Sequence, residues 1–416
     1  MADDPINPEP GDEEPDPPQH SLPAYDEPTP ETHRRMTRED EAELALKNTQ
    51  FEPGTCRLLI ILFLLTIALV PAIQFWAELR TVGAISRLPT FQVFKSLPLV
   101  PHPADLKRVE RTLETDSVVS RWLLPETQFV LTGILRAGNE QVYPGRDKWL
   151  FYRPDVDHVI GPPFLDPFRL KRRAQASAIQ TDPVEGIIDF RDKLAARGIH
   201  LVVLPIPVKP SIEGEKFSKI TVREQALTNA SFIEFKKRLQ DVGIPLFDPT
   251  PLLIEQKAKA ADNPLYLESD THWRPETMEL VAQGLAKYLD LPTGALQAIA
   301  LEKEIVGRGD VATMLKLPPS ANIYPPEKVA IHQITVGNSL WRPDRNASIL
   351  LLGDSFSNVY SLEGMGWGES AGFAEHLSAA LHQPIDCILR NSDAAFATRE
   401  ILSKELNRGQ IGRAHV

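Results

Sequence analysis

Two short stretches, far apart in the chain, carry the residue types of nucleophilic catalysis. One is Asp270-Thr271-His272-Trp273, in which a carboxylate and an imidazole lie two residues apart. The other is an apolar run, 349–352, that ends in Gly353-Asp354-Ser355. A serine hydroxyl is a poor nucleophile until a base takes its proton, and a carboxylate can orient that base. If the fold brings the two stretches together, Ser355, His272 and Asp270 supply nucleophile, base and orienter for acyl transfer.

Each motif alone also fits a structural interpretation. Gly-Asp-Ser is typical of a turn, and Asp-x-His of a hydrogen-bonded structural histidine. In an extended conformation, however, residues i and i+2 point the same way, so Asp270 can hold one imidazole nitrogen while the other faces Ser355. A strand that ends in a glycine turn places the serine at the carboxyl edge of a parallel sheet, where α/β proteins bind ligands. Backbone amides at the start of a following helix can hold an oxyanion.

The elements that must position these residues alternate along the chain. The pattern predicts four strands and, between and around them, four helices. The helices are predicted at 184–196 (ending at Gly198), 230–242, 275–289 and 372–381, and the strands at 199–204, 244–247, 348–352 and 385–389. This alternation indicates a mostly parallel sheet with both faces covered. A turn and an aromatic strand precede it at 145–152, where we interpret Trp149 and Phe151 as core residues.

The first part of the chain differs in composition. Residues 1–55 are rich in proline and acid, which predicts a disordered tail. The apolar segment 57–77 is long enough to cross a bilayer, and a buried helix is the alternative. A long segment precedes it, which disfavours a cleaved signal peptide. Residues 80–137 form a predicted stalk, with helical spacing at 104–113 and 129–135.

Charge and cysteine content exclude several classes of function. The net charge of −11 and the lack of a basic aromatic cluster argue against a nucleic-acid partner. Two cysteines build no disulfide framework and no thiolate metal site. We expect no metal and no bound cofactor. The positive charges flanking 57–77 are nearly balanced, and Arg57 favours a cytoplasmic N-terminus with the large domain outside.

Asp270-Thr271-His272-Trp273 and Gly353-Asp354-Ser355-Phe356 together resemble the alginate O-acetyltransferase family of the AlgJ/AlgX type. These are SGNH-hydrolase-like domains that acetylate secreted polysaccharides. The resemblance covers 138–410 and includes 145–152, Pro207-Val208-Lys209-Pro210 and Gly309-Asp310-Val311. It implies a three-layer α/β/α domain with Ser355 as nucleophile, His272 as base and Asp270 as orienter. Ordinary SGNH hydrolases carry the serine block first; the reversed order here matches the acetyltransferases.

The resemblance further implies a ping-pong reaction through an acetyl-serine. The acetyl group comes ultimately from acetyl-CoA through a membrane-bound O-acyltransferase partner, and the acceptor is a polysaccharide. The protein is then a single-pass inner-membrane protein, surrounded by lipid, with a periplasmic catalytic domain. A polysaccharide acetyl-esterase with the same triad and a non-catalytic polymer-binding subunit of the export machinery are the alternatives. Candidates for the oxyanion hole or for substrate contacts are Gly353, Asn358, Asn391, Lys209, Arg390, Arg399 and Trp273.

The last six residues, 411–416, fit nothing around them and match the translation of a common sequencing adapter. We therefore expect the natural chain to continue past Gln410 into a further closing element of the domain. Resequencing the locus from genomic DNA is expected to return other codons after Gln410. Recovery of the same six codons would contradict this expectation.

Overall fold

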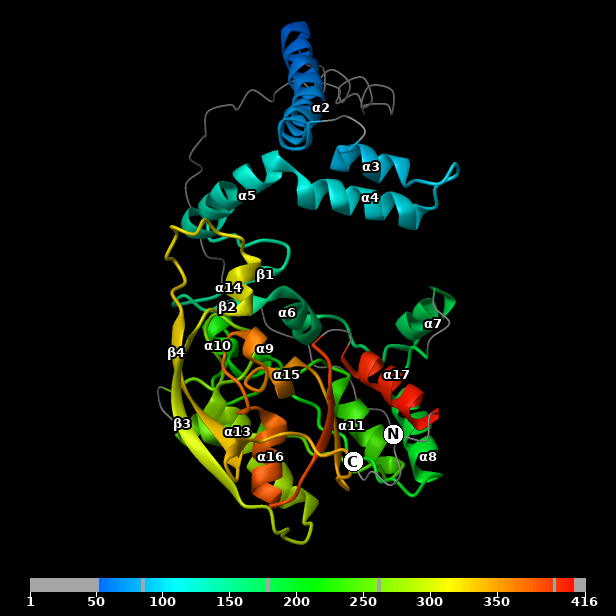
Figure 1. Ribbon diagram of the computed structural model, residues 1–416, viewed down its shortest axis with the longest axis vertical. Coiled ribbons are helices and arrows are strands. Elements are labelled where there is room, and N and C mark those ends of the chain that lie inside the picture. Colours follow the sequence, from blue (N-terminus) through cyan, green and yellow to red (C-terminus); the bar gives the residue numbers. More distant parts are fainter. Residues whose placement is uncertain (1–51, 84–86, 177–179, 260–262, 392–393, 408–416) are drawn as a thin grey trace, which may run out of the picture. The chain divides into compact units, whose positions relative to one another are not determined.

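The computed structural model describes residues 52–83, 87–176, 180–259, 263–391 and 394–407 (Figure 1). The helices are α2 (Pro53–Val82), α3 (Pro89–Lys95), α4 (Pro103–Asp116), α5 (Val118–Phe129), η2 (Val130–Ile134), α6 (Arg153–Ile160), α7 (Pro167–Ala176), α8 (Pro183–Ala195), α9 (Lys209–Ile212), α10 (Gly214–Phe217), α11 (Phe232–Asp241), α12 (Thr250–Lys259), α13 (Pro275–Leu289), α14 (Asp310–Met314), α15 (Ser355–Asn358), η3 (Glu363–Met365), α16 (Phe373–Leu381) and α17 (Ala394–Asn407). The strands are β1 (Val142–Pro144), β2 (Leu150–Tyr152), β3 (Ala298–Gly307), β4 (Glu327–Val336), β5 (Ser339–Leu340), β6 (Leu350–Gly353) and β7 (Asp386–Leu389).

Helix α2 is the one helix in the described part of the chain that is long and apolar enough to cross a membrane. It has 30 residues, and the most apolar part, with a mean hydropathy of 2.7, has no buried residue. That exposure disfavours the alternative of a buried helix. The helix begins at Pro53 and ends at Val82, so it extends past both ends of the predicted segment 57–77. Most of the predicted tail and all of residues 411–416 lie outside the described residues.

The predicted stalk is helical. The spacing at 104–113 corresponds to α4, and the second predicted helix at 129–135 corresponds to the end of α5 and to η2. Pro103 occupies the first turn of α4, where its missing amide costs no hydrogen bond. Ser117 ends α4 and begins α5, and its hydroxyl accepts a hydrogen bond from the Ser120 amide at 3.1 Å.

The parallel part of the domain is built as the alternating pattern predicts. Strands β6 and β7 pair in parallel, with Leu350 opposite Asp386 and Gly353 opposite Leu389. Successive residues of β6 pack on different clusters: Leu350 and Leu352 face α17, and Leu351 faces the main core. The two strands are therefore covered on both faces, as buried parallel strands require.

The other two predicted strands form less regular structure. Segments 199–204 and 244–247 meet in a single parallel bridge, Val203 to Leu246. Val203 packs beside α8 and α11, whereas Val202 and Leu204 pack on the main core. The side chains thus alternate between two layers as in a strand, although the prediction of a full hydrogen-bonded strand is wrong here.

A long antiparallel pair was not predicted. β3 and β4 pair over their whole length, from Ala298 opposite Val336 to Gly307 opposite Glu327. β4 covers one side of α13 and α16 with buried Val329, Ile331 and Ile334 (Figure 1). β3 is mostly exposed and mixes charged with apolar residues, so its sequence lacks the clean alternation of a half-buried strand.

The predicted helices are confirmed with small changes at their ends, as α8, α11, α13 and α16. α13 begins at Pro275, directly after the Asp270–Trp273 stretch, and Gly198 adopts φ +71° after α8. Trp149 and Phe151 are buried core residues, as predicted. The largest core cluster joins them to Trp273, on the same stretch as Asp270 and His272. The stretch that carries Asp270 and His272 is therefore part of the core and not a free loop.

Gly309 lets two backbone segments approach closely at this stretch. A methyl group at Gly309 would lie 2.6 Å from the Asp270 amide nitrogen and closer still to the Ser269 carbonyl. The Gly309 backbone has an ordinary φ of −62°, so space and not conformation requires a glycine here. Because backbone atoms cannot move aside like a flexible side chain, an added methyl must displace the Asp270 segment.

We expect Gly309→Ala to lower the free energy of unfolding by ~1–3 kcal/mol, as overpacking typically does. Urea unfolding of the full chain in detergent measures this. Gly364→Ala is the matched control, because a methyl group there meets nothing within 4 Å. Equal stability of the two variants would contradict the close approach at Gly309.

Candidate active site

The stretch that carries Asp270 and His272 is a tight turn closed by antiparallel hydrogen bonds. The Leu267 amide donates to the His272 carbonyl at 3.1 Å, and the Arg274 amide donates to the Leu265 carbonyl at 2.9 Å. The Tyr360 hydroxyl donates to the Trp273 carbonyl at 2.6 Å. These hydrogen bonds hold the turn independently of the Asp270 and His272 side chains.

Asp270 accepts hydrogen bonds on both of its carboxylate oxygens. Oδ1 receives the His272 ring nitrogen Nδ1 at 2.6 Å and the His272 amide at 3.0 Å. Oδ2 receives the Trp367 indole nitrogen at 2.9 Å and the Asp310 amide at 3.0 Å. Burial disfavours the charged carboxylate, but the attraction to His272 and these hydrogen bonds outweigh it, so the pKa of Asp270 is lowered.

His272 is held in the orientation of a general base. Nδ1 faces the ionised Asp270, which places the proton of the neutral ring on Nδ1 and leaves a lone pair on Nε2. Burial favours the neutral ring, but the charge and hydrogen bond of Asp270 prevail, so the pKa of His272 is raised. Nε2 is buried and has no hydrogen-bond partner among the described residues. The predicted Asp270–His272 pair is therefore present, with one nitrogen left for another group.

Lys209 lies under the turn and does not reach the solvent. The side chain is 1% exposed, and Nζ donates to the carbonyls of Leu150, Glu268 and Asp270 at 2.6, 2.8 and 3.0 Å. Burial lowers the pKa of Lys209 to about 8 against the attraction of surrounding carboxylates. The prediction of a substrate contact by Lys209 is wrong, because its three donors are used to hold the backbone of the turn.

Two further acids hold the turn and were not chosen as site residues from the sequence. Glu327 accepts hydrogen bonds from the Glu268 and Ser269 amides, both at 2.8 Å. Asp310 accepts from the Thr271 amide at 2.8 Å and from the Thr271 hydroxyl at 2.7 Å. The Gly309-Asp310-Val311 motif was a signal for Asp310. For Glu327 no local signal exists, because its partner is 58 residues away.

Ser355 begins α15 directly after β6, as the strand-end prediction requires. Asp354 caps this short helix by accepting the Phe356 amide at 2.9 Å, which leaves Ser355 half-buried at the turn. Gly353 has no space for a side chain, because a methyl group would lie 2.8 Å from Leu389 and even closer to Ser357. The serine thus lies at the carboxyl edge of the parallel pair β6–β7.

The two predicted catalytic stretches meet through the residues beside Ser355. The His272 and Phe356 rings have centroids 4.9 Å apart, and the Trp273 indole donates to the Phe356 carbonyl at 3.1 Å. Burial lowers the pKa of His272, and Asp354 contributes to raising it, after Asp270 and Asp310. Among the described residues no hydrogen bond joins Ser355 to His272. The structure places the serine turn against the histidine turn, and the nucleophile–base contact stays a prediction.

The oxyanion candidates fall into one small region. Asn358 lies one turn after Ser355 in α15, and its amide nitrogen donates to the Asn391 side-chain oxygen at 2.9 Å. The Asn391 amide in turn contacts the Met365 sulfur at 3.1 Å. The Gly353 carbonyl accepts the Arg390 amide at 3.0 Å. The structure therefore brings Gly353, Asn358 and Asn391 to one end of β6–β7, and their role in binding an oxyanion stays a prediction.

The remaining substrate candidates lie in different places. Trp273 is 1% exposed and stacks on Phe373 with centroids 5.8 Å apart, so the prediction of a substrate contact is wrong. Arg399 is half-buried, with its guanidinium 5.8 Å from the Phe190 ring centroid in the layer between α8 and α17. Arg390 is exposed at the end of β7 and remains a candidate.

Asp270, His272 and Asp310 are close enough to hold a metal ion, with one ligand atom of each within 4.8 Å of the others. The carboxylate oxygens are already engaged in hydrogen bonds: Asp270 accepts four, and Asp310 accepts from the amide and the hydroxyl of Thr271. This donor set is therefore arranged to orient an imidazole, which is the requirement of a catalytic triad.

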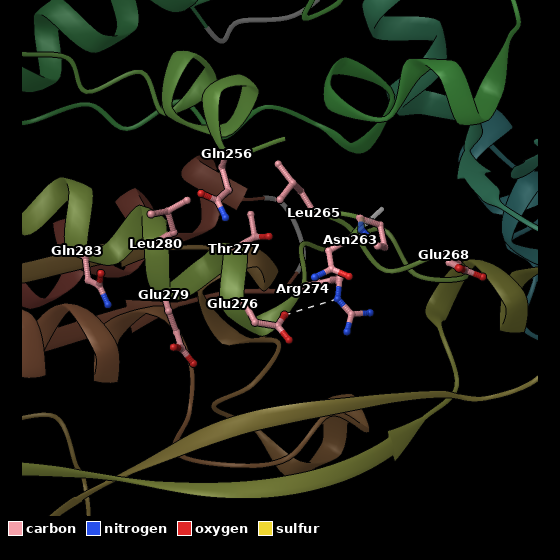
Figure 2. Close-up of a pocket in the computed structure, with 11 residues that line it drawn as sticks. Gln256, Asn263, Leu265, Glu268, Arg274, Glu276, Thr277, Glu279, Leu280 and Gln283 are labelled. Atoms are coloured by element: carbon pink, nitrogen blue, oxygen red, sulfur yellow. Dashed lines mark ion pairs between the residues drawn. The ribbon is translucent and has the colours of Figure 1, made fainter. Parts of the chain in front are cut away.

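A polar groove lies on the other side of the same turn, and Figure 2 shows its lining. It has a volume of about 570 Å³ and lies between α12, α13 and the segment from Asn263 to Glu268. Arg274 pairs with Glu276 at 3.5 Å within it. Neither Ser355 nor His272 lines this groove, so we do not assign acyl transfer to it.

The order of the elements, the strand-end serine and the Asp270–His272 turn define the class of SGNH-hydrolase-like domains. Residues 142–405 match the profile of the family described as "SGNH hydrolase-like domain, acetyltransferase AlgX". The chain belongs to this family. The prediction of the fold class is thereby confirmed, although its regular sheets are mixed and not mostly parallel.

Curated relatives are about a quarter identical to this chain over the part that aligns. A Pseudomonas fluorescens protein named "Probable alginate O-acetylase AlgJ" is 28% identical over 235 residues, which are 54% of this chain and 55% of the relative. A Pseudomonas aeruginosa protein of the same name is 26% identical over 248 residues, or 54% and 57% of the two chains. The chain thus spans about half the length of the curated relatives it matches.

Two solved structures resemble the chain at lower similarity. The O-acetyltransferase domain of Pseudomonas putida AlgJ has a TM-score of 0.48 and 20% identity, over 66% of this chain and 88% of that one. Pseudomonas aeruginosa AlgX has a TM-score of 0.42 and 18% identity, over 60% and 54%.

The raised pKa of His272 predicts how activity depends on pH. A general base must be neutral, so turnover of an acetyl ester is expected to rise with pH through an apparent pKa above 6.5, the ordinary value for histidine. Asp270→Asn removes the charge that raises this pKa. Turnover is then expected to fall by ~10³–10⁴-fold and the acid limb to move to lower pH.

The measurement is ester turnover between pH 5 and 9, with Asp241→Asn, an exposed acid on α11, as the control. An acid limb at the same pH in the parent and in Asp270→Asn would contradict the assignment of Asp270 as the partner of His272.

Proposed function

We propose that this protein is a membrane-anchored O-acetyltransferase that transfers acetyl groups to hydroxyls of a secreted, alginate-like polysaccharide. The observation that carries the proposal is the Asp270–His272 pair, whose free Nε2 is buried beside the turn that begins at Ser355. Family membership and relatives named alginate O-acetylase support acetyl transfer as the reaction and alginate as the type of acceptor.

The reaction follows from the positions of the two turns. His272 Nε2 takes the Ser355 proton while the serine oxygen attacks the donor's acetyl carbonyl. The bond from the acetyl carbon to the donor breaks, and His272 returns the proton to the departing group. The product of this first half is an acetyl-serine. We assign stabilisation of the oxyanion to donors near the start of α15, with Asn358 or Asn391 as candidates.

The second half reverses the roles. A sugar hydroxyl attacks the acetyl-serine, and His272 Nε2 takes the hydroxyl's proton. The bond between the acetyl carbon and Ser355 breaks, and the proton passes to the serine oxygen. Asp270 stabilises the imidazolium in both halves without itself becoming protonated.

The anchor determines where the acetyl group must come from. Helix α2 supports a single membrane span, which we place in the inner membrane with the catalytic domain on the periplasmic side. Acetyl-CoA is a cytoplasmic donor, so a membrane-bound O-acyltransferase passes the acetyl group to this protein. No cofactor bound to the chain is needed, because both half-reactions use protein groups alone.

Ser355→Ala is expected to lower release of p-nitrophenol from p-nitrophenyl acetate to the background rate and to abolish acetylation of an oligomannuronate. Loss of the nucleophile removes both half-reactions, typically a fall of ~10⁶-fold in the rate of the chemical step. The full chain in detergent is assayed, with acetyl on Ser355 and on sugar followed by mass spectrometry.

Ser339→Ala, at an exposed position in β5, is the control and is expected to retain parental activity. Acetate release without sugar modification would favour the esterase instead. Turnover by Ser355→Ala equal to that of the parent would exclude both enzymatic readings.

A further inference from the structure

The start of the stalk exposes large apolar side chains that the described part of the protein leaves uncovered. Helix α3 and the loop after it, residues 89–101, are called the α3 segment below. Its exposed apolar side chains are Phe91 at 48%, Phe94 at 52%, Leu99 at 102% and Val100 at 75%. Single exposed apolar residues are ordinary, but several large ones in one short segment are typical of a surface that meets another apolar phase.

The α3 segment is tied to the end of α2. The Glu78 carboxylate on α2 accepts hydrogen bonds from the Thr90 hydroxyl and from the Thr90 amide, the latter at 3.1 Å. Leu88, the residue before α3, is 2% exposed. The start of α5 is tied to the same turns, since the Gln74 side-chain oxygen accepts the Val118 amide at 2.8 Å. The last turns of α2 therefore hold the start of α3 in place.

These contacts place the start of α3 at the level where the apolar part of α2 ends. The apolar run ends at Trp76, and Glu78 follows two residues later, which is about 3 Å along a helix axis. The Arg80 guanidinium lies 3.7 Å from the centroid of the Trp76 ring. A tryptophan with a basic neighbour is typical of the boundary between hydrocarbon and water. If α2 spans the membrane, α3 therefore begins in this boundary layer.

The composition of the α3 segment suits the boundary layer. Pro98 and Pro101 flank Leu99 and Val100, and proline has no amide N–H, so the loop has few backbone donors that would lose water. Lys95 at the end of α3 is exposed, and a long basic side chain can reach lipid phosphates while its neighbours stay in an apolar layer. A partner protein would also cover apolar side chains, but the bilayer is already brought to this place by α2.

We infer that the α3 segment lies in the headgroup layer of the membrane, with Phe91, Phe94, Leu99 and Val100 directed toward the acyl chains. This inference rests on the membrane span in the proposed function. It gives the protein a second attachment to the phospholipid bilayer, beyond the single span. Because α3 packs against α4 (Figure 1), this attachment restricts how the stalk can tilt relative to the membrane.

The test measures the depth of single labels in the full chain, reconstituted into vesicles of phosphatidylethanolamine and phosphatidylglycerol. Cys56→Ser and Cys387→Ala leave one introduced cysteine to carry an NBD dye. At Leu99→Cys, lipids with a spin label near the headgroup are expected to quench the dye about twofold more than at Ile220→Cys, with emission at shorter wavelength. Ile220 is the matched control, because it is an apolar residue of the catalytic domain and is 91% exposed.

A further pair of variants tests whether the two rings hold the segment in the membrane. Phe91→Ser combined with Phe94→Ser is expected to shift the emission of the dye at Leu99→Cys toward that at Ile220→Cys. Phe168→Ser is the control, because Phe168 lies on α7 in the catalytic domain and is 73% exposed. It is expected to leave the emission unchanged. Thermal midpoints in detergent are expected to be equal in all these variants, because every substituted ring is exposed.

Two outcomes overturn the inference. One is a dye at Leu99→Cys with the emission and quenching found at Ile220→Cys, and the other is an unchanged emission after both phenylalanines are replaced. Leu64→Cys, in the apolar part of α2, separates these from failure of the proposed span. If the dye there is quenched by spin labels deep in the acyl chains while Leu99→Cys stays in water, only the role of the α3 segment is rejected, in favour of a protein partner. A dye in water at Leu64→Cys rejects the span itself.

Discussion

The carboxylate of Asp270 is the interaction on which the rest of the site depends. A buried charge is stable only when it is paired and hydrogen-bonded, and Asp270 is held by the His272 ring, the Trp367 indole and two backbone amides. These donors come from three separate parts of the chain. The indole and the Asp310 amide can reach Asp270 only when the core around α13 and α16 is closed, so folding and assembly of the base are one event.

The same constraint explains the polar residues packed under the turn. A turn inside the core carries backbone groups that cannot reach water, and each must find a partner. Lys209 supplies three donors to carbonyls, while Glu327 and Asp310 accept from amides on the other side. Loss of any of these would leave a buried group unsatisfied. Lys209, Glu327 and Asp310 thus support the turn. The proposed chemistry uses His272 Nε2, which has no hydrogen-bond partner among the described residues.

Much of the fold could be predicted from sequence because it is encoded locally. Helix α13 begins at Pro275 and runs for 15 residues with a regular apolar face, and β6 is a continuous apolar run ended by Gly353. The pair β3–β4 could not be predicted in this way. β3 is mostly exposed, and nineteen residues of intervening chain, 308–326, separate it from its partner β4, so its pairing is a non-local property. The segments 199–204 and 244–247 were predicted as strands but meet in a single bridge, because the extent of their hydrogen bonding depends on neighbours that local pattern does not describe.

The sequence by itself determined the chemical types of the site and the turns on which they lie: Asp270 and His272 two residues apart, and Ser355 after an apolar strand. These are short-range features, since an i,i+2 spacing and a glycine turn act within a few residues. Only the tertiary structure decided which of the candidate side chains are exposed enough to contact a substrate. It buried Lys209 and Trp273, which the sequence analysis had offered as candidates for substrate contacts. The physical reason is that burial and hydrogen-bond partners are set by packing between distant segments, and no local spacing contains that information.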